Sequence, residues 1–211
     1  MKSYRQYCAV ARALDVVGDR WVLLIVRELL ALGPSRYTDL RRGLPGIATN
    51  LLADRLKAME ADGLIERYDA PPPVGTALFR LTERGRELRG VVAALTEWGL
   101  DRMPPGPEAD DAVQPHWSAL AGALLRPDHL APDAEIVVEI TSEGETLTLR
   151  LRHGTFDIRR GPAPHPDLTL TGPSMLVGGL LSGLLPATEA ATQGLRITDP
   201  THLLPTLLPS A

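Results

Sequence analysis

The chain has 211 residues, a length that fits one large domain or two small ones. Its composition, with 44% hydrophobic and 23% charged residues, is that of a globular protein and excludes an intrinsically disordered chain. No apolar run reaches the roughly 18 residues that a membrane-spanning helix needs, and the N-terminus lacks the apolar core of a secretory signal. We therefore expect a cytoplasmic protein without a membrane partner.

Charge is unevenly distributed along the chain. Residues 1–103 hold 16 Lys+Arg and 13 Asp+Glu, a net charge of +3, whereas residues 104–211 hold 6 and 13, a net charge of −7. Residues 104–115, PPGPEADDAVQP, have no apolar periodicity and are typical of a linker. We therefore expect two domains with different partners, residues 1–103 and residues 116–211, joined by a linker at 104–115.

In the first half, helical periodicity predicts helices at 8–17, at 20–32 with Asp19 as its cap, at 37–43, and at 50–61 with Thr49 as its cap. Two short strands, 64–68 and 78–81, are separated by a proline-rich loop and predict a hairpin, and a long helix from 82 to about 103 follows. This order is that of a winged helix-turn-helix, in which the second helix of the pair enters the DNA major groove. The alternative is a small α+β domain without a nucleic-acid role.

The helix at 50–61 is the candidate recognition helix. Its side away from Leu52 carries residues that suit base contacts, since Asn pairs with adenine and Arg or Lys with guanine: Thr49, Asn50, Ala53, Asp54, Arg55 and Lys57. Residues before it suit phosphate contacts: Arg36, Thr38, Arg41 and Arg42. The alternative is an ordinary solvated face of a surface helix.

The second half alternates apolar and polar residues at 134–140, 146–151, 155–159 and 167–171, which predicts an antiparallel meander flanked by helices at 116–125 and 173–181. Residues 175–185, MLVGGLLSGLL, have more apolar surface than one sheet face requires and little packing volume at their glycines. We therefore expect a cavity for an apolar ligand. Its candidate lining is Met175, Leu176, Gly179, Leu180, Gly183 and Leu184. The alternative is a fully packed core.

Three segments in the first half carry a family resemblance. In this order, CAVARALDVVGDRWVLLIVRELL, RYTDLRRGLPGIATNLLADRLKAMEADGLIER and FRLTERGRELRGVVAALTEWG resemble the HxlR-type winged-helix regulators, which are related to the MarR group. The resemblance implies a homodimer joined by helices from both ends of the domain, with residues 50–61 of each subunit on a palindromic operator. Wings of this family usually carry Arg or Lys near the tip. Here nothing basic lies between Tyr68 and Phe79, so Arg80 is the nearest candidate for the wing contact.

A second resemblance covers residues 116–209. The segments PDLTLTGPSMLVGGLLSG and GLRITDPTHLLPTLLP resemble the sterol carrier protein type 2 fold, which implies a sheet covered by helices around an apolar cavity. The expected fold class is therefore α+β: an N-terminal winged helix-turn-helix followed by a C-terminal antiparallel sheet covered by helices.

Cys8 is the only cysteine, and it matches an N-terminal cysteine that some members of the resembled family use as a redox or electrophile sensor. Arg5 and Arg12 lie close enough in sequence to favour its thiolate. The alternative is a small residue buried at the dimer interface. The five histidines lack metal-ligand spacing and are expected at the surface, and no serine stands in a nucleophile elbow. We expect no metal, no cofactor and no enzymatic activity.

These observations predict a dimeric, sequence-specific DNA-binding transcriptional regulator controlled by a small apolar effector, bound in the C-terminal domain or the dimer cleft. Two alternatives stay open. One is a lipid or small-molecule carrier in which the winged helix is a dimerisation scaffold. The other is a thiol sensor that acts through Cys8.

Overall fold

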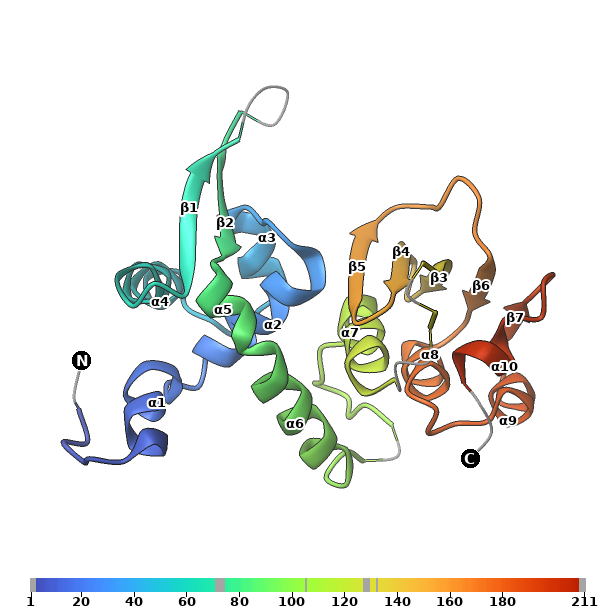
Figure 1. Cartoon of the computed structure of the whole chain (residues 1–211), viewed down its shortest axis with the longest axis horizontal. Coiled ribbons are helices and arrows are strands. Elements are labelled where there is room, and N and C mark those ends of the chain that lie inside the picture. Colours follow the sequence, from blue (N-terminus) through green and yellow to red (C-terminus); the bar gives the residue numbers. More distant parts are fainter. Residues whose placement is uncertain (1–2, 71–74, 105, 127–129, 132, 209–211) are drawn as a thin grey trace. The chain divides into compact units, whose positions relative to one another are not determined.

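The computed structural model describes residues 3–70, 75–104, 106–126, 130–131 and 133–208. The chain divides into two compact units, Met1–Val92 and Ala93–Ala211 (Figure 1). This division falls inside a helix, ahead of the predicted linker at 104–115. Residues 104 and 106–114 form neither helix nor strand. The domain boundary at the linker therefore stays a prediction.

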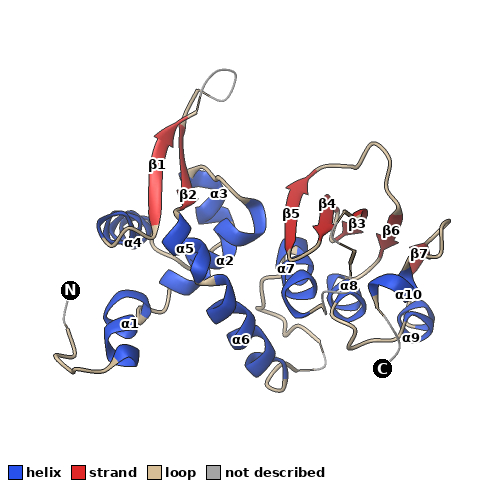
Figure 2. Cartoon of the chain, in the orientation of Figure 1, coloured by secondary structure: helices blue, strands red, loops and turns tan. Residues whose placement is uncertain are grey.

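In the first part of the chain, one β-hairpin lies in sequence between α4 and α5, and the other described elements are helices (Figure 2). Its elements are α1 (Ala9–Val17), α2 (Val22–Leu32), α3 (Tyr37–Arg42), α4 (Thr49–Ala61), β1 (Ile65–Asp69), β2 (Ala77–Leu81), α5 (Glu83–Glu87) and α6 (Arg89–Leu100). Strands β1 and β2 pair antiparallel, as the hairpin prediction required. The buried side chains of α2, α3, α4 and β1 form one core that includes Ile25, Leu40, Leu52, Met59 and Ile65.

Two helix starts differ from the sequence prediction. The Oδ1 of Asp19 accepts a hydrogen bond from the amide of Trp21 at 3.1 Å, yet α2 begins only at Val22. The N-cap of α4 is Ala48, with no side-chain cap, so Thr49 is already helical and the prediction of a Thr49 cap is wrong. Here packing of the apolar face, rather than a capping side chain, determines where α4 begins.

The long helix predicted from residue 82 to residue 103 is two helices. Thr82 caps α5, because its Oγ1 accepts a hydrogen bond from the amide of Gly85 at 3.1 Å. The same hydroxyl donates to the carbonyl oxygen of Gly63 at 2.6 Å, which fastens the helix start to the base of the hairpin. A Cβ on Gly85 would collide with the carbonyl oxygen of Leu64, so only glycine permits this close approach. Leu88 then separates α5 from α6.

The second part of the chain is a five-stranded sheet with helices. Its elements are α7 (Pro115–Leu125), β3 (Glu135–Ser142), β4 (Glu145–Arg152), β5 (Thr155–Arg160), β6 (Leu168–Thr171), α8 (Ser174–Leu181), α9 (Ala187–Thr192), β7 (Arg196–Thr198) and α10 (Leu204–Leu207). The strand order is β5-β4-β3-β6-β7. Glu143 and Gly144 both have positive φ, 49° and 78°, which gives the two-residue turn that right-handed strand twist favours between β3 and β4.

The prediction of an antiparallel sheet is wrong in one respect, because β6 pairs parallel with β3 and the sheet is mixed. The connecting residues 161–167 cross from one edge of the three-stranded meander to the other, about 14 Å for three strand spacings. Seven extended residues reach about 23 Å, so the crossing is short enough. It runs over the polar face, where Thr148 Oγ1 donates to the carbonyl of Gly161 and the amide of Ala163 donates to Glu139 Oε2, both at 2.9 Å.

The opposite face of the sheet is apolar and buried. Alternate residues of four strands supply it: Ile136, Val138, Ile140, Leu147, Leu149, Leu151, Ile158, Leu168 and Leu170. Helix α7 packs near β4 and β5, and α8 packs against α7. That helix pair approaches closely, since a Cβ on Gly122 would lie 2.5 Å from the Cβ of Leu181. No helix in the described part of the chain has the length and hydropathy to span a membrane.

Candidate nucleic-acid interface

Helices α3 and α4 and the turn between them form a rigid helix-turn-helix. The hydroxyl of Tyr37, the first residue of α3, donates to the carbonyl oxygen of Thr49 at the start of α4, with an O–O distance of 2.7 Å. Leu40, Leu44 and Ile47 are buried beneath the turn. The start of α4 is therefore fixed to α3 both by a hydrogen bond and by packing. Sequence reasoning did not single out Tyr37, because its role depends on a contact twelve residues away.

A buried ion pair lies behind this turn. Glu28 is 1% exposed, and Arg27 Nε donates to its Oε1 at 3.0 Å. Arg27 Nη2 also donates to the carbonyl oxygen of Gly43, at the end of α3, at 3.1 Å. Burial lowers the pKa of Arg27, and the adjacent Glu28 carboxylate offsets part of that change. A Cβ on Gly43 would collide with the Glu28 carboxylate, so the turn needs glycine there. The signal in the sequence was a charged pair inside an otherwise apolar helix.

The outer face of α4 carries most of the predicted base-contacting residues. Thr49, Asn50, Ala53, Asp54 and Lys57 are all exposed, on the side opposite the buried stripe of α4. The helix therefore presents one polar face while its apolar face anchors it. This arrangement is compatible with insertion into a groove about 12 Å wide.

Arg55 lies elsewhere than predicted. Its guanidinium Nη2 pairs with Asp19 Oδ2 at 3.0 Å, and its side chain is 28% exposed. It is therefore on the flank of α4 that faces the α1–α2 turn, rather than on the outer face. A role for Arg55 in base contacts would require this ion pair to break.

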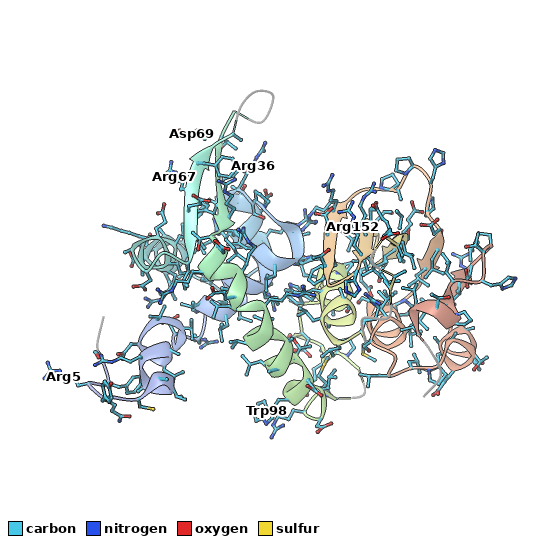
Figure 3. The ribbon with its side chains drawn as sticks, in the orientation of Figure 1. Arg5, Arg36, Arg67, Asp69, Trp98 and Arg152 are labelled. Carbon is cyan, nitrogen blue, oxygen red and sulfur yellow. The ribbon has the colours of Figure 1, made fainter. Side chains whose placement is uncertain are left out.

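The predicted phosphate-contacting residues cluster around α3. Arg36, Thr38, Arg41 and Arg42 are all exposed, and Arg41 and Arg42 form the last turn of α3. Cations at this end interact favourably with the helix dipole. Figure 3 shows Arg36 beside the hairpin.

The wing contributes two arginines with different surroundings. Arg80 Nε pairs with Glu66 Oε1 across the two strands at 2.7 Å, and its guanidinium carbon lies 4.6 Å from the ring centroid of Tyr68. Arg67, which sequence reasoning missed, is exposed on β1 and extends from the hairpin on the side of α4 (Figure 3). It immediately precedes Tyr68, so it lies just outside the stretch between Tyr68 and Phe79 that has no basic residue. Residues 71–74 of the connecting loop lie outside the described part of the chain.

The single cysteine and two of the histidines were also given predicted environments. Cys8 is exposed and is the N-cap residue of α1, a position compatible both with a thiol sensor and with a residue that a second copy covers. His116 is fully buried, which contradicts its predicted surface position, and His129 lies outside the described residues. In the described part of the chain, no group of three or more His, Cys, Asp or Glu side chains is placed to hold a metal ion.

The predicted ligand-contacting residues of the second half do not share one environment. Leu176 and Leu180 are buried, whereas Met175 and Leu184 are 43% and 63% exposed. A Cβ on Gly179 would lie 3.1 Å from the Cβ of Leu185, so this glycine is in close contact. Gly183 has a φ of +77°, a conformation that favours glycine.

Comparison with known proteins identifies relatives of the first half. The family described as HxlR-like helix-turn-helix matches residues 16–106. The HTH-type transcriptional regulator YvaP of Bacillus subtilis (strain 168) is 30% identical over 94 residues, 44% of this chain and 86% of that protein. An HTH-type transcriptional regulator of Mycobacterium bovis is 40% identical over 96 residues, 46% of this chain and 60% of that protein. The solved structure of the redox regulator HypR in its reduced form is 30% identical, covering 45% of this chain and 93% of that chain, with a TM-score of 0.42.

Proposed function

Because the chain belongs to the HxlR-like helix-turn-helix family of transcriptional regulators, we propose that it binds a palindromic operator as a homodimer. In this proposal α4 of each copy enters the major groove, with Asn50 and Lys57 at base edges. The observation that carries the proposal is the exposed polar face of α4 on a helix held by Tyr37 and by the buried pair behind the turn.

The proposal assigns the remaining exposed cations to the DNA backbone. Arg36, Arg41 and Arg42, with Thr38, suit phosphates beside the groove, because such contacts fix orientation without reading sequence. Arg67 replaces Arg80 as the wing residue closest to DNA, since Arg80 already pairs with Glu66 and covers Tyr68.

Dimer formation is supported by exposed apolar residues at helical spacing near both ends of the winged-helix half. On α1 these are Val10 and Leu14, preceded by Tyr7, and on α6 they are Val91, Leu95 and Trp98. Two copies joined there would present two α4 helices, and half-sites about 34 Å apart would then fall on one face of the duplex.

The test uses a duplex selected by the protein from a random pool. Asn50→Ala should cost roughly 1–3 kcal/mol on the selected duplex and have little effect on random DNA. Arg41→Ala should weaken both and reduce the slope of log K against log salt by about one. Equal losses on both duplexes for both variants would refute this division of roles.

We further propose that the second half senses a small apolar molecule, with Met175, Leu176, Gly179, Leu180, Gly183 and Leu184 as its contact residues. The support is the exposure of Met175 and Leu184 next to the buried Leu176 and Leu180. The sterol carrier-like resemblance points in the same direction. The competing carrier interpretation, with the winged helix as a scaffold only, predicts no salt-dependent preference for the selected duplex, so the same DNA titrations separate the two.

A thiol-sensing function is the second candidate, and one observation favours it. Cys8 is exposed at the N-terminus of α1, where oxidants in solution reach its thiol. Oxidant-dependent loss of DNA binding in the wild type, abolished by Cys8→Ser, would support this candidate. A response that persists in Cys8→Ser would exclude it.

A further inference from the structure

The first unit contains a cavity of about 620 Å³ whose lining includes none of the residues proposed to contact DNA, although Leu14 also belongs to the proposed dimer contact. It lies between the N-terminal residues Ser3 and Tyr4, helix α1, the α1–α2 turn and helix α4. Its apolar wall is formed by Leu14, Val16, Val22, Ala58 and Met59. This volume is within the range of about 300–1,000 Å³ that small-molecule pockets occupy.

The charged residues of the cavity have an excess of carboxylates. Among the described residues, the carboxylates of Asp15, Asp19 and Asp62 line it together with the guanidinium of Arg55. Oδ2 of Asp15 also lies 3.6 Å from Nη1 of Arg12, a mostly exposed side chain. Arg55 is already paired with Asp19, with Nη2 and Oδ2 3.0 Å apart. Asp62, at the C-terminal end of α4, has no ion-pair partner within the part of the chain that the structure describes.

Asp15 remains a carboxylate at neutral pH. Its Oδ1 accepts a hydrogen bond from the amide of Tyr4, and its Oδ2 accepts one from the hydroxyl of Ser3, both at 2.7 Å. These bonds, the first of them above all, lower the pKa of Asp15. The same bonds hold Ser3 and Tyr4, which both line the cavity, beside α1.

We propose that this cavity binds an organic cation with an apolar body. The apolar wall would accommodate the body, and the carboxylates, above all that of Asp62, would favour the positive charge, whereas an organic anion would meet these carboxylates and a guanidinium that is already paired with Asp19. Occupancy of the cavity is independent of the proposed DNA-binding function. Its regulatory consequence rests on that function.

The regulatory consequence follows from the position of α4, which supplies Arg55, Ala58, Met59 and Asp62 to the cavity. A cation beside Asp19 competes with Arg55 for that carboxylate. Release of Arg55 removes the ion pair that connects α4 to the α1–α2 turn. The ligand therefore changes operator affinity through the same helix that contacts DNA.

The experiment measures binding of tetraphenylphosphonium to the full chain by isothermal titration calorimetry, with tetraphenylborate as a ligand of the same shape and opposite charge. We expect saturable binding of the cation and no comparable binding of the anion. Asp62→Asn should weaken cation binding roughly fivefold. The matched control is Glu60→Gln, which removes one exposed carboxylate two residues away, outside the cavity, and should leave binding unchanged. Equal binding of both ions, or equal effects of both substitutions, would overturn the proposal.

A second variant tests the location of the site. Ala58→Phe fills the cavity from α4, so it should abolish cation binding while circular dichroism shows a folded chain. Persistence of binding in this variant would overturn the proposal, and so would loss of binding on dimerisation, because the partner copy would then occupy the cavity. If the cation binds but operator affinity does not change, the site stands and its regulatory consequence fails.

Discussion

Helices α7 and α8 bury most of their large apolar side chains within the chain, whereas α1 and α6 leave several large apolar side chains exposed. In the first pair, Ala119, Leu120, Val177, Leu180 and Leu181 are buried. In the second pair, large apolar side chains recur at helical spacing and stay exposed: Val10 at 67%, Leu14 at 44%, Leu95 at 45% and Trp98 at 62%. Both pairs are made of apolar-rich helices of eight to twelve residues. The difference is whether the fold supplies a covering surface.

This difference indicates which apolar side chains are covered within a single copy and which need another molecule to cover them. Contiguous exposed apolar surface on a globular protein marks an interaction site. Helices α7 and α8 bury most of their large apolar side chains within one unit, whereas α1 and α6 each leave large apolar side chains exposed. These exposed side chains are where we place the second copy.

The largest expected effect is on dimerisation and comes from an exposed aromatic residue of α6, Trp98. Trp98→Ala should weaken dimerisation by about 2–4 kcal/mol, because a large aromatic residue at the centre of an interface is a typical hot spot. The stability of the isolated chain should change little, since the side chain is mostly exposed. Sedimentation equilibrium of the full chain measures the change, with Met175→Ala, an exposed apolar residue on α8, as control. A wild type that stays monomeric at micromolar concentration would contradict the dimer.

The next effect concerns one glycine in each helix pair, Gly122 on α7 and Gly90 on α6. Gly122→Ala should destabilise the α7–α8 region by about 1–3 kcal/mol, because the new Cβ meets that of Leu181 at 2.5 Å. Gly90→Ala on α6 should instead stabilise by up to about 1 kcal/mol, since nothing lies within 4 Å and alanine favours helix. Urea unfolding of both variants measures the two signs, and destabilisation of the same size in both would refute the contrast in packing.

The smallest effect concerns the N-terminal segment beside α1. The pKa of Asp15 is lowered below its ordinary value of 3.8, chiefly by the hydrogen bond from the amide of Tyr4. The stabilisation that the ionised Asp15 gives the folded N-terminal segment is therefore fully present above pH 3.8 and is lost as pH falls through the lowered pKa. Hydrogen exchange of the Tyr4 amide should therefore accelerate beyond its intrinsic pH dependence in strong acid. Asp15→Asn should abolish this extra acceleration, and an unchanged profile in that variant would contradict the role of Asp15.

Most elements were predictable because they rest on local periodicity. The stripe of Leu52, Leu56 and Met59 predicted α4, and alternation predicted β3, β4 and β5 within one or two residues of their observed ends. The parallel pairing of β6 with β3 was not predictable in this way. Alternation is the same for either direction, and the crossing of residues 161–167 over the polar face is a long-range event.

The candidate site was predictable where a side chain acts alone and not where it acts through a partner. Asn50 and Lys57 are exposed as expected. Arg55 was misplaced because its partner Asp19 comes 36 residues earlier, in the α1–α2 turn. Tyr37 and Arg27 were overlooked because each hydrogen-bonds a backbone carbonyl that is distant in sequence. Such contacts depend on the assembled fold.

The central claim is that two copies, joined through the uncovered helices, place two α4 helices on one operator. The most direct measurement is the stoichiometry of the protein–DNA complex by analytical ultracentrifugation, on the selected palindrome and on a duplex in which one half-site is scrambled. We predict two chains per palindrome and a large loss of affinity on the half-site duplex. One chain per duplex, with equal affinity for both, would contradict the claim.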